Sequence, residues 1–192
     1  HNDQICYQVG PSFRYKKLLH FKVSPKNSKR ILAVLSNIEK EIESALYFLV
    51  QFPENFEIYL KFHPSTDISR YKHRLPINIK IADDDLYECF KTTKLVIGRS
   101  TGALVEAISL GIPTIVFDDN GLCHDFIPPH ADGKGLIWEK AFNISEALEL
   151  IKRFEENLIT KSDEIESLTQ QYKEMFFCEP SDQKIIETFD LN

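Results

Sequence analysis

Apolar and polar residues follow one another along this chain in a pattern typical of strands that alternate with helices. Short apolar runs bounded by Gly, Pro, Asn or Asp predict buried strands. Stretches in which apolar residues recur about every three or four positions predict amphipathic helices. The expected strands are 31–35, 56–62, 77–81, 95–97, 112–117 and 135–138, and the expected helices are 13–19, 38–50, 65–74, 86–92, 103–110, 144–154 and 161–177.

Capping residues precede several of these helices. Ser36-Asn37, Asp83 to Asp85, and either Asn143 or Ser145 stand where a side chain would accept a hydrogen bond from the first helical turn. Regular alternation of strand and helix predicts a parallel sheet with right-handed crossovers and helices on both faces. The expected fold is therefore an α/β/α sandwich of three layers, with about five to six strands in its sheet. We expect one domain at 25–177, preceded by a linker at 1–24 and followed by a tail at 178–192.

The segment Lys94–Phe117 reads as strand, turn, helix and strand, and it is the centre of the expected fold. Its turn lies at the carboxyl end of a strand, where parallel sheets bind ligands and where a helix start exposes backbone N–H groups to an anion. Ser100 or Thr101 can cap the helix, and Gly102 leaves room for a ligand. Glu106 lies about one and a half turns into the helix, within reach of a group held over its start.

Four residues of that helix, Leu104, Ile108, Ala103 and Ala107, are spaced to face the sheet. Gly111 and Pro113 are expected to end the helix. The turn has neither the Gly-Lys-Ser/Thr end of a P-loop nor the Gly-x-Gly-x-x-Gly fingerprint, and a plain strand–helix turn remains the alternative.

His63-Pro64 ends the second expected strand and so lies on the same sheet edge as Ser100. The alternative for His63 is a histidine satisfied by nearby backbone. Arg99 either pairs with a phosphate or braces the turn.

The loop 118–134 is long and polar, and loops of that kind are often functional. His124 and Asp125 within it are candidates for contact with a ligand. Metal ligation is chemically possible for the carboxylates and imidazoles of this loop, but their spacing matches no zinc or calcium motif. We therefore expect no metal, and a solvent-facing polar loop is the alternative.

The charge, the cysteine spacing and the length of the apolar segments limit which kinds of partner and location we expect for the chain. The formal charge is −6 and no basic run is present, so nucleic acid is not an expected partner. The four cysteines are far apart, which favours reduced thiols in a cytoplasmic protein. No apolar segment approaches the roughly 18 residues of a membrane helix. The chain begins at His1, so we expect a piece of a longer protein.

Together, the motifs resemble the carboxyl-terminal, donor-binding half of GT-B fold glycosyltransferases, a Rossmann-like domain. The resemblance rests on Arg99 to Ala103, on Glu106-Ala107, and on Gly111 to Pro113, which look like the donor signature shared with UDP-N-acetylglucosamine 2-epimerases. His63-Pro64 with the later Ser-Thr pair is similar to motifs of bacterial sialyl- and polysialyltransferases and of CDP-glycerol transferases. Thr101 is an extra residue relative to the Ser-Gly-Ala form of the signature.

The resemblance implies a glycosyltransferase that uses a CMP- or UDP-linked sugar in the synthesis of surface polysaccharide or glycoconjugate. It assigns Arg99, Ser100, Thr101 and Gly102 to nucleotide and phosphate, Glu106 to ribose, and His63 to phosphate or sugar as the candidate catalytic residue. No cofactor is implied. A glycan or lipid-linked acceptor would bind an amino-terminal domain absent from this chain, so we expect the chain alone to be inactive.

The same resemblance implies a cytoplasmic location, and it would allow the full-length protein to associate with the inner face of the membrane. Two alternatives stay open. One is a nucleotide-sugar 2-epimerase, and the other is a non-catalytic nucleotide-binding α/β module.

Overall fold

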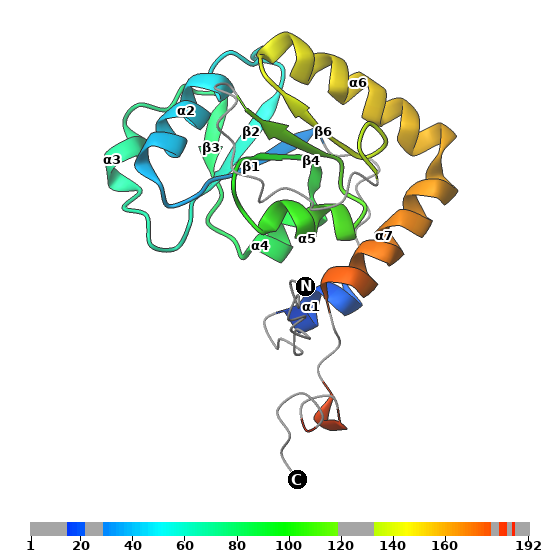
Figure 1. The fold of residues 1–192 in the computed structure, drawn as a ribbon. Coiled ribbons are helices and arrows are strands. Elements are labelled where there is room, and N and C mark those ends of the chain that lie inside the picture. The colour runs from blue at the N-terminus through cyan, green and yellow to red at the C-terminus, as the bar shows by residue number, and fades with distance from the viewer. Residues whose placement is uncertain (1–14, 22–28, 119–132, 178–180, 184–185, 187–192) are drawn as a thin grey trace, which may run out of the picture.

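The structure is a computed structural model that describes residues 15–21, 29–118, 133–177, 181–183 and 186. Its described part holds a six-stranded parallel sheet in the order β3-β2-β1-β4-β5-β6 (Figure 1). The expected parallel α/β sheet is thus confirmed. The strands are β1 Arg30–Val34, β2 Glu57–Lys61, β3 Ile79–Ile81, β4 Thr93–Gly98, β5 Thr114–Phe117 and β6 Trp138–Ala141.

Helices cover both faces of this sheet, as the alternation of strand and helix predicted (Figure 1). On one face pack α2 Glu39–Leu49, α3 Ser69–Lys72 and α6 Ile144–Thr160. On the other face pack α1 Lys16–His20, α4 Leu86–Lys91, α5 Ala103–Ser109 and α7 Ser162–Phe176. The three-layer sandwich is therefore also confirmed.

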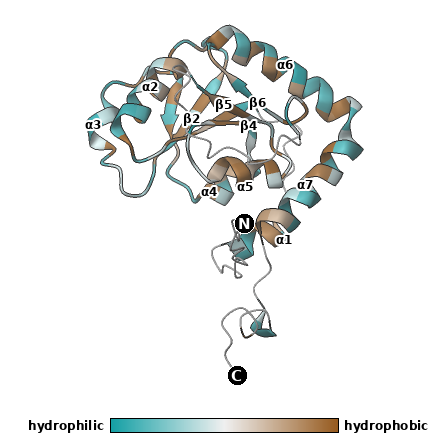
Figure 2. Ribbon diagram, in the orientation of Figure 1, coloured by the Kyte–Doolittle hydropathy of each residue, from teal (hydrophilic) through white to brown (hydrophobic). Residues whose placement is uncertain are grey.

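Each central strand feeds two apolar cores because successive side chains of a strand point to opposite faces. In β4, Leu95 and Ile97 join the core under α2 and α6, whereas Val96 joins the core under α4, α5 and α7. Strands β4 and β5 are mainly apolar, and the outward side of α6 is polar (Figure 2). Burial on both faces explains why these strands read as continuous apolar runs.

Two strand predictions, those of β3 and β6, needed adjustment at their starts. Ile77 was expected in β3, but it is 95% exposed and lies within a turn closed by a hydrogen bond from the Ile79 N–H to the Pro76 carbonyl. The edge strand was expected at 135–138 and lies at Trp138–Ala141. Gly133 and Gly135 both have positive φ, so the chain turns there before the strand starts.

The helix caps were predicted with mixed success. Asp85 and Asn143 each accept a hydrogen bond from a backbone N–H of the first turn, of Tyr87 and Glu146 respectively, as expected. The Ser36-Asn37 cap was wrong, because α2 begins after Ile38 and the Ser36 hydroxyl accepts only the Ile38 N–H. That bond forms a local serine turn ahead of the helix.

Two expected segments, the linker at 1–24 and the tail at 178–192, lie mainly outside the described residues, and the 25–177 boundaries remain a prediction. Within the described part, no helix combines the length and the apolar character needed to cross a membrane.

Candidate functional site

The candidate site is the edge of the sheet at which the parallel strands have their carboxyl ends. Strand order runs outward from β1 through β2 to β3 on one side and from β4 through β5 to β6 on the other. The order therefore reverses between β1 and β4, and ligands of open α/β sheets bind outside such a switch point. The turn after β4, residues 98–102, starts at this place (Figure 1).

Gly98 ends β4 in close contact with its neighbours. A Cβ atom placed on Gly98 would lie 2.7 Å from a methyl of Val34, 2.9 Å from the Val34 carbonyl oxygen and 2.9 Å from Leu104. Only a glycine permits this approach of β4 to β1 and α5. The start of the turn is thereby fixed against two neighbouring elements.

Ser100 lies in the middle of this turn in a left-handed conformation, with φ of 50°. That conformation is uncommon for residues other than glycine and costs about 1–2 kcal/mol. Its hydroxyl is covered, and among the described residues it has no hydrogen-bond partner. Buried hydroxyls usually have a partner, so the turn presents a polar group that a ligand can satisfy.

Helix α5 begins at Ala103, but the residue at its N-cap differs from the one predicted. Its N-cap is Gly102, and no side chain caps it, so the prediction of Ser100 or Thr101 as the capping residue was wrong. The Thr101 hydroxyl accepts only a long contact of 3.4 Å from the Ala103 N–H. Among the described residues, no atom lies within 4 Å of a Cβ placed on Gly102. Because α5 begins at Ala103, its first turn contains Glu106.

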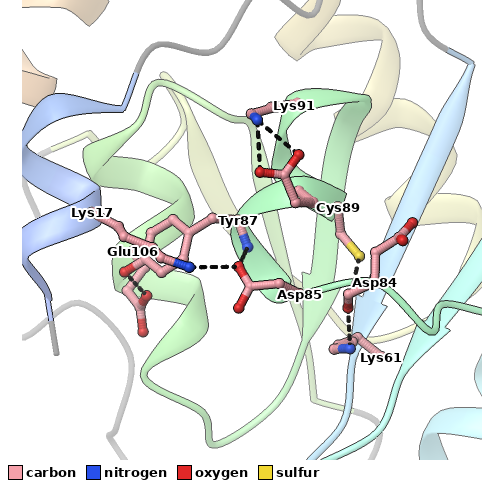
Figure 3. Close-up of polar contacts among 9 residues, drawn as sticks. Lys17, Lys61, Asp84, Asp85, Tyr87, Cys89, Lys91 and Glu106 are labelled. Atoms are coloured by element: carbon pink, nitrogen blue, oxygen red, sulfur yellow. Dashed lines mark hydrogen bonds and ion pairs between the residues drawn. The ribbon is translucent and has the colours of Figure 1, made fainter.

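Glu106 is a buried carboxylate, only 3% exposed, on the face of α5 that packs toward α4. Its Oε2 atom accepts a hydrogen bond of 2.7 Å from the phenol of Tyr87 on α4. Figure 3 shows the two side chains directed toward one another from their helices. Burial of an ionised carboxylate is costly without donors, so this bond stabilises the pair of helices as well as the acid.

Tyr87 was not among the residues that the sequence pointed to as part of a site. Tyr87 is 8% exposed, and its ring packs edge-on against Phe21 and Phe90, with centroids 5.6 and 6.0 Å apart. A tyrosine next to an apolar face carries no sequence signal that distinguishes a core ring from a carboxylate partner. Contact with Glu106, 19 positions later, depends on how α4 and α5 pack.

The first turn of α4 is held in place by charged groups. The Asp85 carboxylate accepts a hydrogen bond of 3.0 Å from the Tyr87 N–H and lies 3.8 Å from the Lys17 ammonium (Figure 3). On the next turn, the Cys89 thiol contacts the Asp84 carbonyl at 3.7 Å, and burial raises the pKa of that thiol. Cys89 is a free thiol, and it is the one cysteine that the described ranges include.

Arg99 follows Gly98 and points to the other face of the sheet from the one that α5 covers. Its side chain is buried, and the guanidinium carbon lies 5.8 Å from the centroid of the Phe117 ring. Phe117 in turn stacks on Phe48 of α2 at 5.4 Å. Asp118, which follows β5, is buried as well and lies 3.6 Å from the Lys140 ammonium. The role of Arg99, with a phosphate or as a brace of the turn, stays a prediction.

His63 lies after β2, two strand positions from β4 and thus roughly 10 Å away along the edge. It is exposed, and its Nδ1 atom lies 2.7 Å from the Ser65 hydroxyl and accepts the Ser65 N–H at 3.2 Å. Nearby groups of its own turn therefore satisfy one side of the ring. The Thr66 hydroxyl of this turn is covered without a partner among the described residues.

Other predicted features are distributed away from this edge or outside the described part. His124 and Asp125 fall in the range 119–132, which the structure does not describe. Within the described ranges, no group of three His, Cys, Asp or Glu side chains is arranged to hold a metal.

A hollow of about 360 Å³ lies between β6 and α6 and is lined by Glu139, Lys140, Glu146, Glu149, Leu150 and Arg153. That hollow shares no residue with the turn after β4.

Comparison with known proteins shows what fold this is. No protein-family model matches the sequence, and no curated protein matches it. Among solved structures, the H548A variant of the wall teichoic acid polymerase TagF aligns with a TM-score of 0.51 and 13% identity, over 90% of this chain and 44% of that one. The glycosyltransferase SnogD from Streptomyces nogalater aligns with a TM-score of 0.50 and 16% identity, over 88% and 48%. A UDP-GlcNAc 2-epimerase from Neisseria meningitidis, bound to UDP-GlcNAc, aligns with a TM-score of 0.46 and 22% identity, over 87% and 45%.

The likenesses to TagF and SnogD establish the fold of the chain. It has the Rossmann-like α/β fold found in one half of GT-B glycosyltransferases, as the sequence motifs led us to expect. The chain spans less than half the length of the structures that it resembles, 44% and 48% of TagF and SnogD.

Proposed function

We propose that this chain binds the nucleotide-sugar donor of a glycosyltransferase that makes a surface polysaccharide or glycoconjugate. The donor sugar would be linked to CMP or UDP. The observation that carries the proposal is the place of the turn 98–102, which leaves β4 at the carboxyl edge where strand order reverses. The fold shared with TagF and SnogD supports the same assignment.

The donor phosphate is assigned to the turn itself. The covered Ser100 hydroxyl, which has no partner among the described residues, can donate to a phosphate oxygen. The open space beside Gly102 admits the phosphate to the backbone, and Thr101 offers a second hydroxyl. We give Arg99 the supporting role, because its side chain is buried over Phe117.

Glu106 is assigned to the ribose. A carboxylate accepts hydrogen bonds from two neighbouring hydroxyl groups, and a buried carboxylate does so in surroundings of low dielectric, where each bond is stronger. His63 is assigned to the phosphate or the sugar through its Nε2 atom, since Nδ1 contacts Ser65. His124 and Asp125 keep their proposed place in a loop near the donor.

Transfer itself would take place in the full-length protein. The similar chains are about twice as long as this one, and we assign the acceptor, a glycan or a lipid-linked glycan, to the part that this chain lacks. Polar groups at the departing phosphate stabilise the charge that develops there, which is electrostatic catalysis at a leaving group. Peripheral association with a membrane is part of the same proposal for the full-length protein.

Calorimetry with CMP, UDP and their sugar conjugates tests the proposal. We expect at least one of these ligands to bind the chain, and Glu106→Gln to weaken binding about 10- to 100-fold, because hydrogen bonds to charged groups contribute about 1.5–3 kcal/mol. Glu156→Gln, on the exposed side of α6, is the matched control and should leave affinity unchanged. Absence of binding by every one of these ligands at millimolar concentration would refute the proposal.

A further inference from the structure

Tyr87 connects the segment around α1 to the carboxylate of Glu106. Its ring meets Phe21 edge-on at 5.6 Å, and its hydroxyl donates to Glu106 Oε2 at 2.7 Å (Figure 3). Both Tyr87 and Glu106 are at least nine-tenths buried. The bond therefore joins two helices inside the core and is not a surface contact.

The position of the Tyr87 hydroxyl is set by rigid surroundings. The Tyr87 N–H is held by the Asp85 carboxylate at 3.0 Å, in the capped first turn of α4. The ring lies against Phe21 and Phe90, so its two side-chain torsions are restricted by packing on both sides. A phenol held in this way is a fixed donor.

A fixed donor orients a flexible acceptor. A glutamate side chain has three rotatable bonds, and anchoring one carboxylate oxygen fixes the plane and the direction of the other. Loss of the donor would leave a buried carboxylate one hydrogen bond short. Geometry at Glu106 thus depends on a hydroxyl from a different helix.

We infer that Tyr87 is a positioning residue of the nucleotide site: it holds the Glu106 carboxylate where it accepts the ribose 2′-hydroxyl, and so lets the site distinguish ribonucleotides from deoxyribonucleotides. This inference rests on the proposed function, in which Glu106 contacts the ribose. The ligand class that it specifies is a ribonucleotide with an intact 2′-hydroxyl. A site built to bond a hydroxyl discriminates strongly against the analogue that lacks it, because the acceptor is then left unpaired.

The test compares affinities of CMP and 2′-deoxy-CMP, and of UDP and 2′-deoxy-UDP, for the 192-residue chain by calorimetry. We expect the wild type to prefer the ribonucleotide at least about tenfold. In Tyr87→Phe that ratio should fall to about threefold or less, while affinity for the deoxynucleotide stays within about twofold. Tyr71→Phe is the matched control, because Tyr71 is equally buried but lies in the core on the other face of the sheet, and its ratio should equal that of the wild type.

The outcomes separate the two proposals. If the wild type binds no nucleotide, or binds both forms equally, the assigned ribose contact fails and the inference fails with it. If the wild type discriminates and Tyr87→Phe discriminates as well, only the role of Tyr87 is refuted. An equal loss of affinity for both forms would show a merely structural effect and would also refute that role.

A second variant keeps the inference testable if Tyr87→Phe does not fold. In Tyr87→Phe/Glu106→Gln the neutral amide no longer requires a donor for a buried charge, so this variant is the less destabilised one. Its ribose-to-deoxyribose ratio should equal that of Glu106→Gln alone, because Tyr87 acts through Glu106. A further fall of the ratio in the double variant would overturn the inference.

Discussion

Two turns lie on the same edge of the sheet, one after β2 and one after β4, and they hold their ionisable side chains in different ways. After β2, His63 is exposed and contacts Ser65, two residues away. After β4, the turn leads to Glu106, which is buried and bonded to Tyr87 on another helix. Each turn also covers a hydroxyl that has no partner among the described residues, Thr66 after β2 and Ser100 after β4.

The difference shows which of the two turns depends on the rest of the fold for its stability. A polar side chain that is satisfied within its own turn needs nothing from the rest of the molecule. A buried carboxylate and a left-handed serine are unfavourable unless the surrounding structure determines them, and such features cluster at functional sites. The turn after β4 is therefore the stronger candidate for a ligand site, and the following predictions test that ranking.

The largest expected effect is a loss of stability when the close packing of Gly98, at the start of the turn after β4, is disturbed. Gly98→Ala should lower the free energy of unfolding by about 1–3 kcal/mol, because the added methyl overlaps Val34, including its backbone, and Leu104. Gly102→Ala is the matched control, since the added methyl meets no atom of the described residues within 4 Å, and it should change stability by no more than about 0.5 kcal/mol. Urea unfolding measures both, and equal effects would contradict the close packing described at Gly98.

Removing one hydroxyl from each turn should change the stability of the protein in opposite directions, by smaller amounts. Ser100→Ala removes a covered hydroxyl that has no partner among the described residues, so stability should stay the same or rise by up to about 1 kcal/mol. Ser65→Ala removes the hydroxyl that contacts His63, so stability should fall by about 0.5 kcal/mol. Thermal unfolding of the two variants shows whether each substitution raises or lowers stability. A clear loss of stability in Ser100→Ala would contradict the described difference between the two turns.

The smallest effect concerns the ion pair between Glu43 of α2 and Arg74, which follows α3. The bidentate hydrogen bond from Arg74 lowers the pKa of Glu43 below its usual 4.5. A carboxyl whose pKa is lower in the folded state stabilises the fold above its unfolded pKa, and this contribution is lost as pH falls through the folded pKa. Both side chains are more than a third exposed, so the contribution should be under about 1 kcal/mol.

Unfolding of wild type and Arg74→Gln at neutral pH and near pH 3 measures this contribution. We expect the two curves to differ at neutral pH and to converge at low pH. Lys152→Gln, on the exposed side of α6, is the control and should follow the wild type at both values. A difference that persists unchanged at low pH would show that Arg74 acts through packing and not through its charge.

Much of the fold could be predicted because it depends on local periodicity. Apolar runs located all six described strands to within a few residues, and Asp85 and Asn143 were recognised as caps because a cap is a bond within three positions. Errors occurred where neighbouring choices have similar energies. The start of β6 depends on two glycines with positive φ, and the start of α2 depends on a serine turn that replaces the expected cap.

The sequence by itself determined that strands and helices alternate, that the sheet is parallel, and that His63, Ser100 and Glu106 are candidates, because residue types and short spacings suffice for these conclusions. Only the tertiary structure decided that Ser100 is left-handed, that Arg99 is buried over Phe117, and that Tyr87 bonds Glu106. These last features join elements far apart in the chain. Their geometry arises when helices pack on the sheet, and no spacing along the sequence encodes it.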